Sequence, residues 1–232
     1  MLKKLLALFS SEPSKQAKPS KPAAPKPKKK KIESTRIGEL GEHKINIQLD
    51  QLPKECKYLS DVLLSNPKSR SGYSQIDHLV ISPYGLFVIE TKNYNGEIKG
   101  TKTDTYWTVS NRYKLYNPLM QNYGHIKALQ AQLSEFPEAR YISMISFTMR
   151  CRFGIDPELR KIQSDDLIVY DVELSEFIQR KLARLKIELG SPAFSGNDVN
   201  LIYEKINQKN ITDPQIRADH TANLQKTIKN PS

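Results

Sequence analysis

Three charged residues near the middle of the chain have the types and spacing of a metal-dependent hydrolytic site. Asp77 lies within Ser74–Gly100, and Glu90 and Lys92 follow in the same stretch, two residues apart. Carboxylate oxygens are the ligands that Mg²⁺ prefers, and a neighbouring ammonium group can stabilise negative charge on a phosphate. These residues therefore predict metal-assisted hydrolysis of a phosphate ester.

The residues around them predict a β-hairpin that would bring the three together. Two apolar, β-branched runs, Gln75–Ile81 and Leu86–Thr91, flank Ser82–Gly85, which is made of turn-forming residues. With Pro83 and Tyr84 at the centre of the turn, Leu79 faces Val88 and Asp77 faces Glu90. Opposed Cβ atoms lie about 4.5–5.5 Å apart, so one cation could bind both carboxylates. Strand alternation places Lys92 on the same face as Glu90.

The Glu-x-Lys tripeptide by itself carries no information, because it begins at residues 42, 55, 90 and 97. The context favours Glu90, since it ends an apolar run typical of a central strand, where an unpartnered carboxylate is costly to bury. The alternative interpretation is a solvated charge cluster at the end of a hairpin.

Four motifs in a fixed order carry a resemblance to a known family. They are Gly38-Glu39-x-Gly41-Glu42, Gln75-Ile76-Asp77-His78, Gly85–Asn93 with Gly96-x-Ile98, and Asn117-Pro118-x-x-Gln121. Over residues 36–129 this pattern resembles the nuclease-related domain, NERD, which is similar to the PD-(D/E)xK, or restriction-endonuclease-like, nucleases. Ile76 stands where the superfamily's name has Pro, and it suits the Ile-Asp form of the nuclease-related domain.

The resemblance implies a Mg²⁺-dependent nuclease, with Mn²⁺ as a possible substitute and DNA a better-supported substrate than RNA. It implies that Asp77, Glu90 and Glu42 are the metal ligands. Glu42 is preferred over Glu39, and both lie on the first helix, which the apolar pattern predicts from Ile37 to the residue before Pro53. It also implies that Lys92 positions the attacking hydroxide or stabilises the transition state, and that Gln121 joins the catalytic set. His125 lies four residues after Gln121 on the same helix face, and we expect it to be an ordinary helix residue.

Strands alternating with helices around an antiparallel hairpin predict an α/β fold, a restriction-endonuclease-like mixed sheet flanked by helices, with a C-terminal helical extension. We expect Trp107 and Tyr113 to pack in the interior. The predicted divisions are an apolar and basic segment (1–9), a disordered Pro- and Lys-rich linker (10–35), the nuclease-related α/β domain (36–190) and the extension (191–232). The extension carries no recognisable chemistry.

The formal net charge of +11 is concentrated in the N-terminal tail. Residues 1–36 hold eleven Lys or Arg against Glu12 and Glu33, which leaves only +2 for the rest of the chain. We expect nucleic-acid contacts from Lys68 and Arg70, in a loop beside the hairpin, and from Lys28, Lys29, Lys30 and Lys31. The tail could also contact an anionic membrane surface, or serve only as a solvated tether.

Two cysteines are too few for a disulfide scaffold and fit a reduced, cytoplasmic setting, and residues 1–9 are too short to span a bilayer. The sequence lacks a glycine-rich phosphate loop, a nucleophile elbow and a dinucleotide fingerprint. Two other functions stay open beside the nuclease. One is a catalytically inactive nuclease-fold module that binds nucleic acid or a protein, and the other is a protein held at the membrane surface by its tail.

Overall fold

The computed structural model describes residues 43–229, with side chains described for residues 43–223. Glu42, Glu39 and the tail predicted at residues 1–35, with its four consecutive lysines, lie outside the described residues. The predicted first helix is seen from residue 43 to residue 49, and Ile45 and Leu49 on it are buried.

The main sheet has five strands in the order β1-β2-β3-β7-β9. These are β1 (Lys57–Ser65), β2 (Tyr73–Ser82), β3 (Gly85–Lys92), β7 (Tyr141–Phe147) and β9 (Asp166–Tyr170). The first three strands are antiparallel neighbours, whereas β7 and β9 run parallel to β3. β3 is therefore a central strand paired on both sides, which explains its continuous apolar run.

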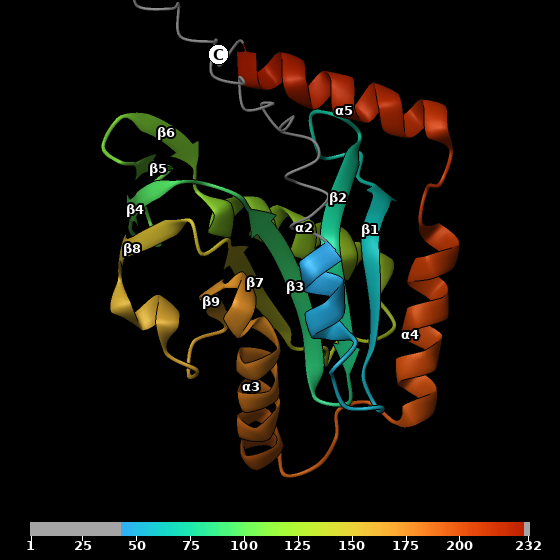
Figure 1. The fold of residues 1–232 in the computed structure, drawn as a ribbon. Helices are drawn as coiled ribbons and strands as arrows, with labels where there is room; N and C mark the ends of the chain where they lie inside the picture. Colours follow the sequence, from blue (N-terminus) through green and yellow to red (C-terminus); the bar gives the residue numbers. More distant parts are fainter. Residues whose placement is uncertain (1–42, 230–232) are drawn as a thin grey trace, which may run out of the picture. The chain divides into compact units, whose positions relative to one another are not determined.

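A second sheet of four strands, in the order β6-β5-β4-β8, lies beyond the carboxyl end of β3 (Figure 1). It consists of β4 (Gly96–Gly100), β5 (Tyr106–Val109), β6 (Tyr113–Tyr116) and β8 (Cys151–Ile155). β8 pairs in parallel with β4 and was not expected from the sequence. Trp107 packs in the interior as predicted, but the prediction for Tyr113 is wrong, because 69% of its surface is exposed.

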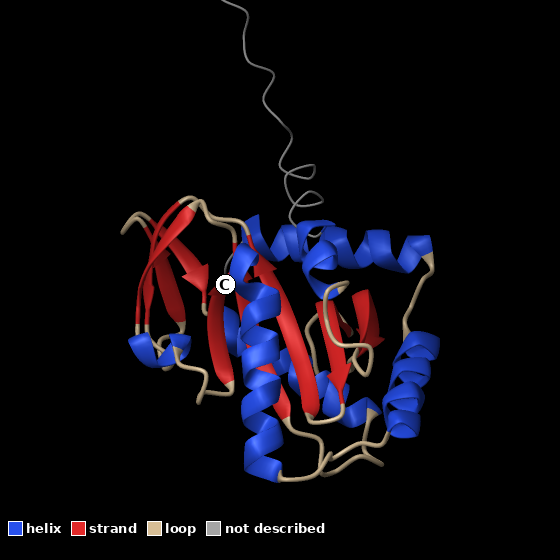
Figure 2. Ribbon diagram, turned by 60° about the horizontal axis from the view of Figure 1, so that its bottom comes forward, coloured by secondary structure: helices blue, strands red, loops and turns tan. Residues whose placement is uncertain are grey.

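Helices cover both faces of the main sheet, as Figures 1 and 2 show. They are α2 (Pro118–Gln132), α3 (Leu174–Leu189), α4 (Gly196–Lys209) and α5 (Pro214–Lys229), with short 3₁₀ turns at η1 (Pro157–Arg160) and η2 (Asp171–Glu173). α2 and α4 pack on one face, while α3 and the helical segment 43–49 pack on the other. None of the described helices is long and apolar enough to cross a membrane.

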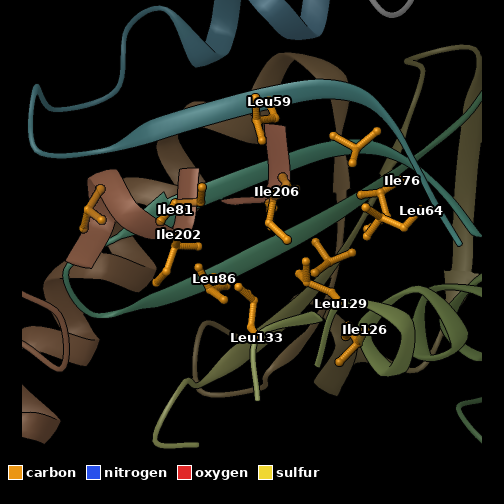
Figure 3. Packing of buried hydrophobic residues seen from close by; sticks show 14 of the residues in the cluster. Leu59, Leu64, Ile76, Ile81, Leu86, Ile126, Leu129, Leu133, Ile202 and Ile206 are labelled. Carbon is orange, nitrogen blue, oxygen red and sulfur yellow. The ribbon is translucent and has the colours of Figure 1, made fainter. Parts of the chain in front are cut away.

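The face covered by α2 and α4 forms one continuous core, shown in Figure 3. Side chains of β1, β2 and β3 meet Ile126 and Leu129 of α2, Leu133 directly after its end, and Ile202 and Ile206 of α4. Both α4 isoleucines are completely buried. The first helix of the predicted C-terminal extension thus contributes to the core that supports β2 and β3.

The hairpin of β2 and β3 has the predicted register, with Leu79 opposite Val88 and Ser82 opposite Gly85. The predicted pairing of Asp77 with Glu90 is not formed, because the ladder ends at His78 opposite Ile89. The Asp77 carboxylate instead accepts the backbone N–H of Thr91, so a side chain takes the place of a ladder bond.

The mixed-sheet α/β fold predicted from the sequence is confirmed by these two sheets and their covering helices.

Candidate functional site

A buried triangle of polar side chains lies where β3 ends against the first turns of α2. Lys92 Nζ donates to Glu90 Oε1 at 2.6 Å and to Gln121 Oε1 at 2.9 Å, and Gln121 Nε2 donates to Glu90 Oε1 at 2.7 Å. Alternation along β3 places Glu90 and Lys92 on one face, as predicted; this face meets α2, which brings Gln121 from 31 positions further along the chain. Three residues identified in two separate motifs therefore meet in one network.

The charges of the triangle stabilise one another. Burial raises the pKa of Glu90, but the ammonium of Lys92 and the nearby His125 outweigh that effect and lower it to about 2. Burial lowers the pKa of Lys92, and the adjacent Glu90 carboxylate more than offsets this, so the net shift is upward. Glu90 is therefore ionised and Lys92 protonated throughout the physiological range.

Asp77 lies close to this triangle but is held differently. Its Oδ2 accepts Thr91 N at 2.7 Å and Thr91 Oγ1 at 2.6 Å, whereas its Oδ1 takes no hydrogen bond from any described residue. Burial and the charge of Glu90 raise the pKa of Asp77 to about 7, even though the two hydrogen bonds from Thr91 oppose the shift. The carboxylates of Asp77 and Glu90 thus repel each other, and Asp77 Oδ1 is not used by the protein. A cation bound between the two carboxylates would remove this repulsion.

A cavity of about 140 Å³ opens at Asp77 and is lined by polar side chains of β1, β2 and the helical segment 43–49. His78 is one of them, and its Nε2 lies 3.2 Å from Asn46 Oδ1. Burial lowers the pKa of His78 to about 4, so this imidazole is neutral. The residues lining the cavity are Asn46, Ser60, Asp61, Gln75, Asp77 and His78.

Asp61 forms the far wall of that cavity and is fixed by the C-terminal helix α5. It has a positive φ of 53°, unusual for a residue other than glycine. Arg217 of α5 donates to Asp61 Oδ2 at 2.7 Å and to the Asp61 carbonyl at 2.8 Å, and Gln75 donates to Oδ1. A helix that the sequence did not connect with the site therefore holds one of its walls.

His125 belongs to the site, contrary to the expectation that it is an ordinary helix residue. Its Nε2 lies 3.4 Å from Glu90 Oε2, and its Nδ1 lies 2.7 Å from Ser74 Oγ. The spacing of four from Gln121 was the signal, because both residues then share the helix face that meets β3. Sequence reasoning missed Ser74, Thr91 and Asp61, since small polar residues in strands give no comparable pattern.

The position of α2 is set by two buried asparagines. Asn117 caps the helix by accepting Leu119 N at 2.9 Å, and its amide donates to the Asp104 carbonyl at 2.7 Å. Asn122 donates to the Val88 carbonyl of β3 and to Ser143 Oγ of β7, both at 2.8 Å. Because Asn122 directly follows Gln121, these bonds hold the Gln121 side chain at the end of β3.

The structure does not connect Lys68 or Arg70 with the triangle. Lys68 and Arg70 are exposed in the loop between β1 and β2, and Glu42 and the four tail lysines lie outside the described residues. Within residues 43–229, no three His, Cys, Asp or Glu side chains gather as a metal site. Asp77 and Glu90 nevertheless fit a hard cation, because both supply carboxylate oxygens and Asp77 Oδ1 is unused.

Comparison with known proteins adds a family to this geometry. Residues 37–148 match the model of the nuclease-related domain. An uncharacterised protein of Bacillus anthracis is 29% identical over 191 residues, a match that covers 81% of this chain and 83% of the relative. No solved structure matches the chain. The matched segment contains Asp77, Glu90, Lys92 and Gln121, so the resemblance to the nuclease-related domain seen in the motifs is confirmed over residues 37–148.

Proposed function

We propose that this protein is a metal-dependent nuclease that hydrolyses phosphodiester bonds in nucleic acid, with DNA as the preferred substrate. The observation that carries the proposal is the triangle of Glu90, Lys92 and Gln121 beside Asp77. Burying a carboxylate, an ammonium and a third polar group together is expensive for a purely structural purpose, and hydrophobic side chains would stabilise the core at least as well. Such arrangements concentrate at functional sites.

Asp77 and Glu90 would hold Mg²⁺ or Mn²⁺, with Glu42 as the third ligand predicted by the sequence. When bound, the ion would supply Lewis-acid activation of water and neutralisation of phosphate charge. Asp77 offers its unused Oδ1, and it must lose its proton to do so. Glu90 is already ionised and is oriented by the donors on its Oε1.

Lys92 supplies a positive charge that can stabilise the negative charge developing on the phosphate during cleavage. Its ammonium has two acceptors in this state, Glu90 Oε1 and Gln121 Oε1, and an ammonium has three donor hydrogens. The remaining N–H can donate to a phosphate oxygen or an attacking hydroxide while both protein contacts persist. Gln121 keeps Lys92 and Glu90 in place by bonding both, and His125 supports Glu90 through Oε2.

Cleavage assays test the proposal directly. The full chain is incubated with plasmid DNA, single-stranded DNA and RNA, each with Mg²⁺, Mn²⁺ or EDTA. We expect DNA cleavage with either metal and none with EDTA. Asp77→Ala and Glu90→Ala should each abolish cleavage while the protein stays folded, whereas Glu176→Ala, which removes an exposed carboxylate of α3, should not. Metal-dependent turnover at the wild-type rate in Asp77→Ala or Glu90→Ala would refute the assignment.

The third ligand is tested by a matched pair of substitutions in the first motif. Glu42→Ala should lower the affinity for Mg²⁺ and the cleavage rate, whereas Glu39→Ala should leave both unchanged. The reverse result would transfer the ligand to Glu39.

A binding module without turnover is the second candidate, and one observation favours it. Glu90 Oε1 already accepts two hydrogen bonds, and no complete metal-ligand group is found in the part of the chain that the structure describes. If the wild-type protein binds nucleic acid but cleaves none of the three substrates with either metal, this second function replaces the first.

A further inference from the structure

The hairpin of β5 and β6 exposes tyrosines on a surface where packing does not require them. Half of the surface of Tyr106 and 47% of that of Tyr116 are exposed. The hairpin's other face supplies its core contacts, because Trp107, Val109 and Leu115 are all buried. The two exposed tyrosines therefore lie outside the core of the second sheet, and their rings are accessible to a ligand.

Register places these tyrosines side by side on the outer face. Tyr106 pairs directly with Tyr116 across the two strands, and their rings form an edge contact with centroids 6.0 Å apart. Lys114 lies two residues before Tyr116, so it points to the same face, and its Nζ is 5.7 Å from the Tyr106 ring centre. Aromatic rings and a cation thus share one small patch, which we call the tyrosine face (Tyr106, Lys114 and Tyr116).

The positive charge of this patch is not neutralised by the protein. Lys114 forms no ion pair with any residue that the structure describes, and neither does Arg112 in the turn between the strands. Both side chains are exposed. Two free cations beside two exposed rings are complementary to a polyanion that also presents flat aromatic groups.

The tyrosine face lies close in the chain to a residue of the candidate site. Only four residues separate Tyr116 from Gln121. Successive Cα atoms are about 3.8 Å apart, so these two residues lie within about 19 Å of each other, a span of a few nucleotides. Asn117 fixes the junction, since it bonds both the first turn of α2 and the loop that precedes β5.

We propose that the tyrosine face binds a single-stranded segment of nucleic acid and leads it to the triangle of Glu90, Lys92 and Gln121. The role of the triangle as the destination of the strand rests on the proposed function, whereas the binding to the tyrosine face does not. In a duplex the base faces are stacked on one another, so only a single strand can lay bases on Tyr106 and Tyr116. Lys114 and Arg112 then pair with the phosphates that connect those bases.

Binding without hydrolysis tests the inference. Fluorescence anisotropy in EDTA measures the affinity of the full chain for a fluorescein-labelled 20-nucleotide dT strand and for a labelled 20-base-pair duplex. The double variant Tyr106→Ala with Tyr116→Ala should bind the single strand at least about tenfold more weakly, on the scale of losing base stacking. Its affinity for the duplex should change by less than about twofold. The N-terminal lysines are common to all variants, so they do not affect these ratios.

Matched variants separate stacking from charge and from misfolding. Tyr123→Ala removes an equally exposed tyrosine on α2 that stacks with Lys127, and it should bind like the wild type. Changing Tyr106 and Tyr116 to Phe should retain most of the affinity for the single strand. Lys114→Ala should reduce the magnitude of the slope of log affinity against log salt concentration by about 1, the value expected for the loss of one phosphate contact. Thermal melting confirms that each variant is folded.

The inference fails if the double alanine variant binds the single strand as well as the wild type does, or loses duplex and single-strand affinity equally. A wild-type protein that cleaves nothing but shows the expected selective loss would refute the nuclease proposal and leave the tyrosine face as a binding surface.

Discussion

Among the described residues, Lys181 is completely buried and Lys92 is mostly shielded from solvent, and their partners differ in kind. Lys181 of α3 has no exposed side-chain surface and donates to the carbonyls of Ile162, Gln163 and Ser164 at 2.9–3.3 Å, with Asp165 2.8 Å away. Lys92 is 15% exposed, and its hydrogen bonds go to the side chains of Glu90 and Gln121. The ammonium of Lys181 binds the backbone of a loop, whereas the ammonium of Lys92 binds side chains that belong to two separate sequence motifs.

The difference distinguishes a structural lysine from one that is available for chemistry. Backbone carbonyls in a loop cannot move without moving the chain. We therefore infer that Lys181, which binds three such carbonyls and Asp165, serves only to hold residues 162–165 against α3. Side-chain acceptors can rotate or exchange partners at small cost, and Lys92 retains both partial exposure and an unused N–H. Burial alone would have ranked Lys181 above Lys92 as a functional candidate.

Replacing Lys181 should have the largest effect, and the effect should be on stability. Lys181→Met leaves three loop carbonyls without their donor, although Asp165 keeps its two bonds from Arg140, and each interior acceptor left unsatisfied typically costs about 1–3 kcal/mol. For a protein of this size, 3 kcal/mol lowers the melting temperature by about 6–12 °C. Calorimetry measures this, and cleavage by the remaining folded fraction should proceed at the wild-type rate. A melting temperature within about 2 °C of the wild type would contradict the structural role.

Replacing Lys92 should reverse that pattern. Lys92→Met should lower the rate of metal-dependent cleavage by at least roughly 10², the scale for losing one preorganised charge. Binding of Mg²⁺, followed by calorimetry, should persist, because the carboxylates remain. If metal binding disappeared together with Lys92, the ammonium would be needed to build the metal site, and the separation of roles between the two lysines would break down.

Thr91 offers a smaller and sharper test of the same region. Thr91→Val keeps the shape of the side chain but removes the hydroxyl that donates to Asp77 Oδ2. Hydrogen bonds to charged groups contribute about 1.5–3 kcal/mol, so affinity for Mg²⁺ should fall roughly tenfold with little change in stability. Thr148→Val, which removes an exposed hydroxyl bonded to Asn93, is the matched control. Equal Mg²⁺ affinity in Thr91→Val and the wild type would mean that Asp77 needs no positioning.

The smallest expected effect is a pH dependence that originates at Asp77. Its folded-state pKa of about 7 is above the ordinary value of 3.8, so the stability contributed by its protonation is present at low pH and is lost as pH rises through 7. Asp77→Asn does not titrate. The melting temperature of Asp77→Asn minus that of the wild type, both measured in EDTA, should therefore increase from pH 5 to pH 8. A constant difference across that range would show that Asp77 has an ordinary pKa.

The strands that position the site could be predicted from sequence because local patterns determine them. The hairpin turn around Pro83 and Tyr84 fixed the register, and the alternation that followed placed Glu90 and Lys92 on one face. The capping sequence at Asn117 and Pro118 fixed the start of α2 and hence the position of Gln121. These features depend on residues close to one another in the chain, where turn and cap chemistry act.

The parts that could not be predicted depend on contacts between distant segments. The pairing of β4 with β8 joins residues more than 50 positions apart, and the composition of neither strand indicates which strand it pairs with. The interruption at Asp77 arose because a side chain competed for the Thr91 amide, which no periodicity reveals. The contact of His125 with Glu90 depends on how α2 packs on the sheet, which the spacing of His125 from Gln121 does not determine.

The contact between Arg217 and Asp61 has a consequence during synthesis of the chain. The two residues are 156 positions apart, and translation at about 5–20 residues per second would take roughly 8–30 s to cover that distance. Once residue 121 has been made, the nascent polypeptide contains Asp77, Glu90, Lys92 and Gln121, but the cavity wall at Asp61 still lacks its guanidinium partner. The wall beside Asp77 is therefore completed only when the ribosome has made α5, so a shortened translation product that ends before Arg217 would carry every motif of the nuclease-related domain and still lack one wall of its cavity.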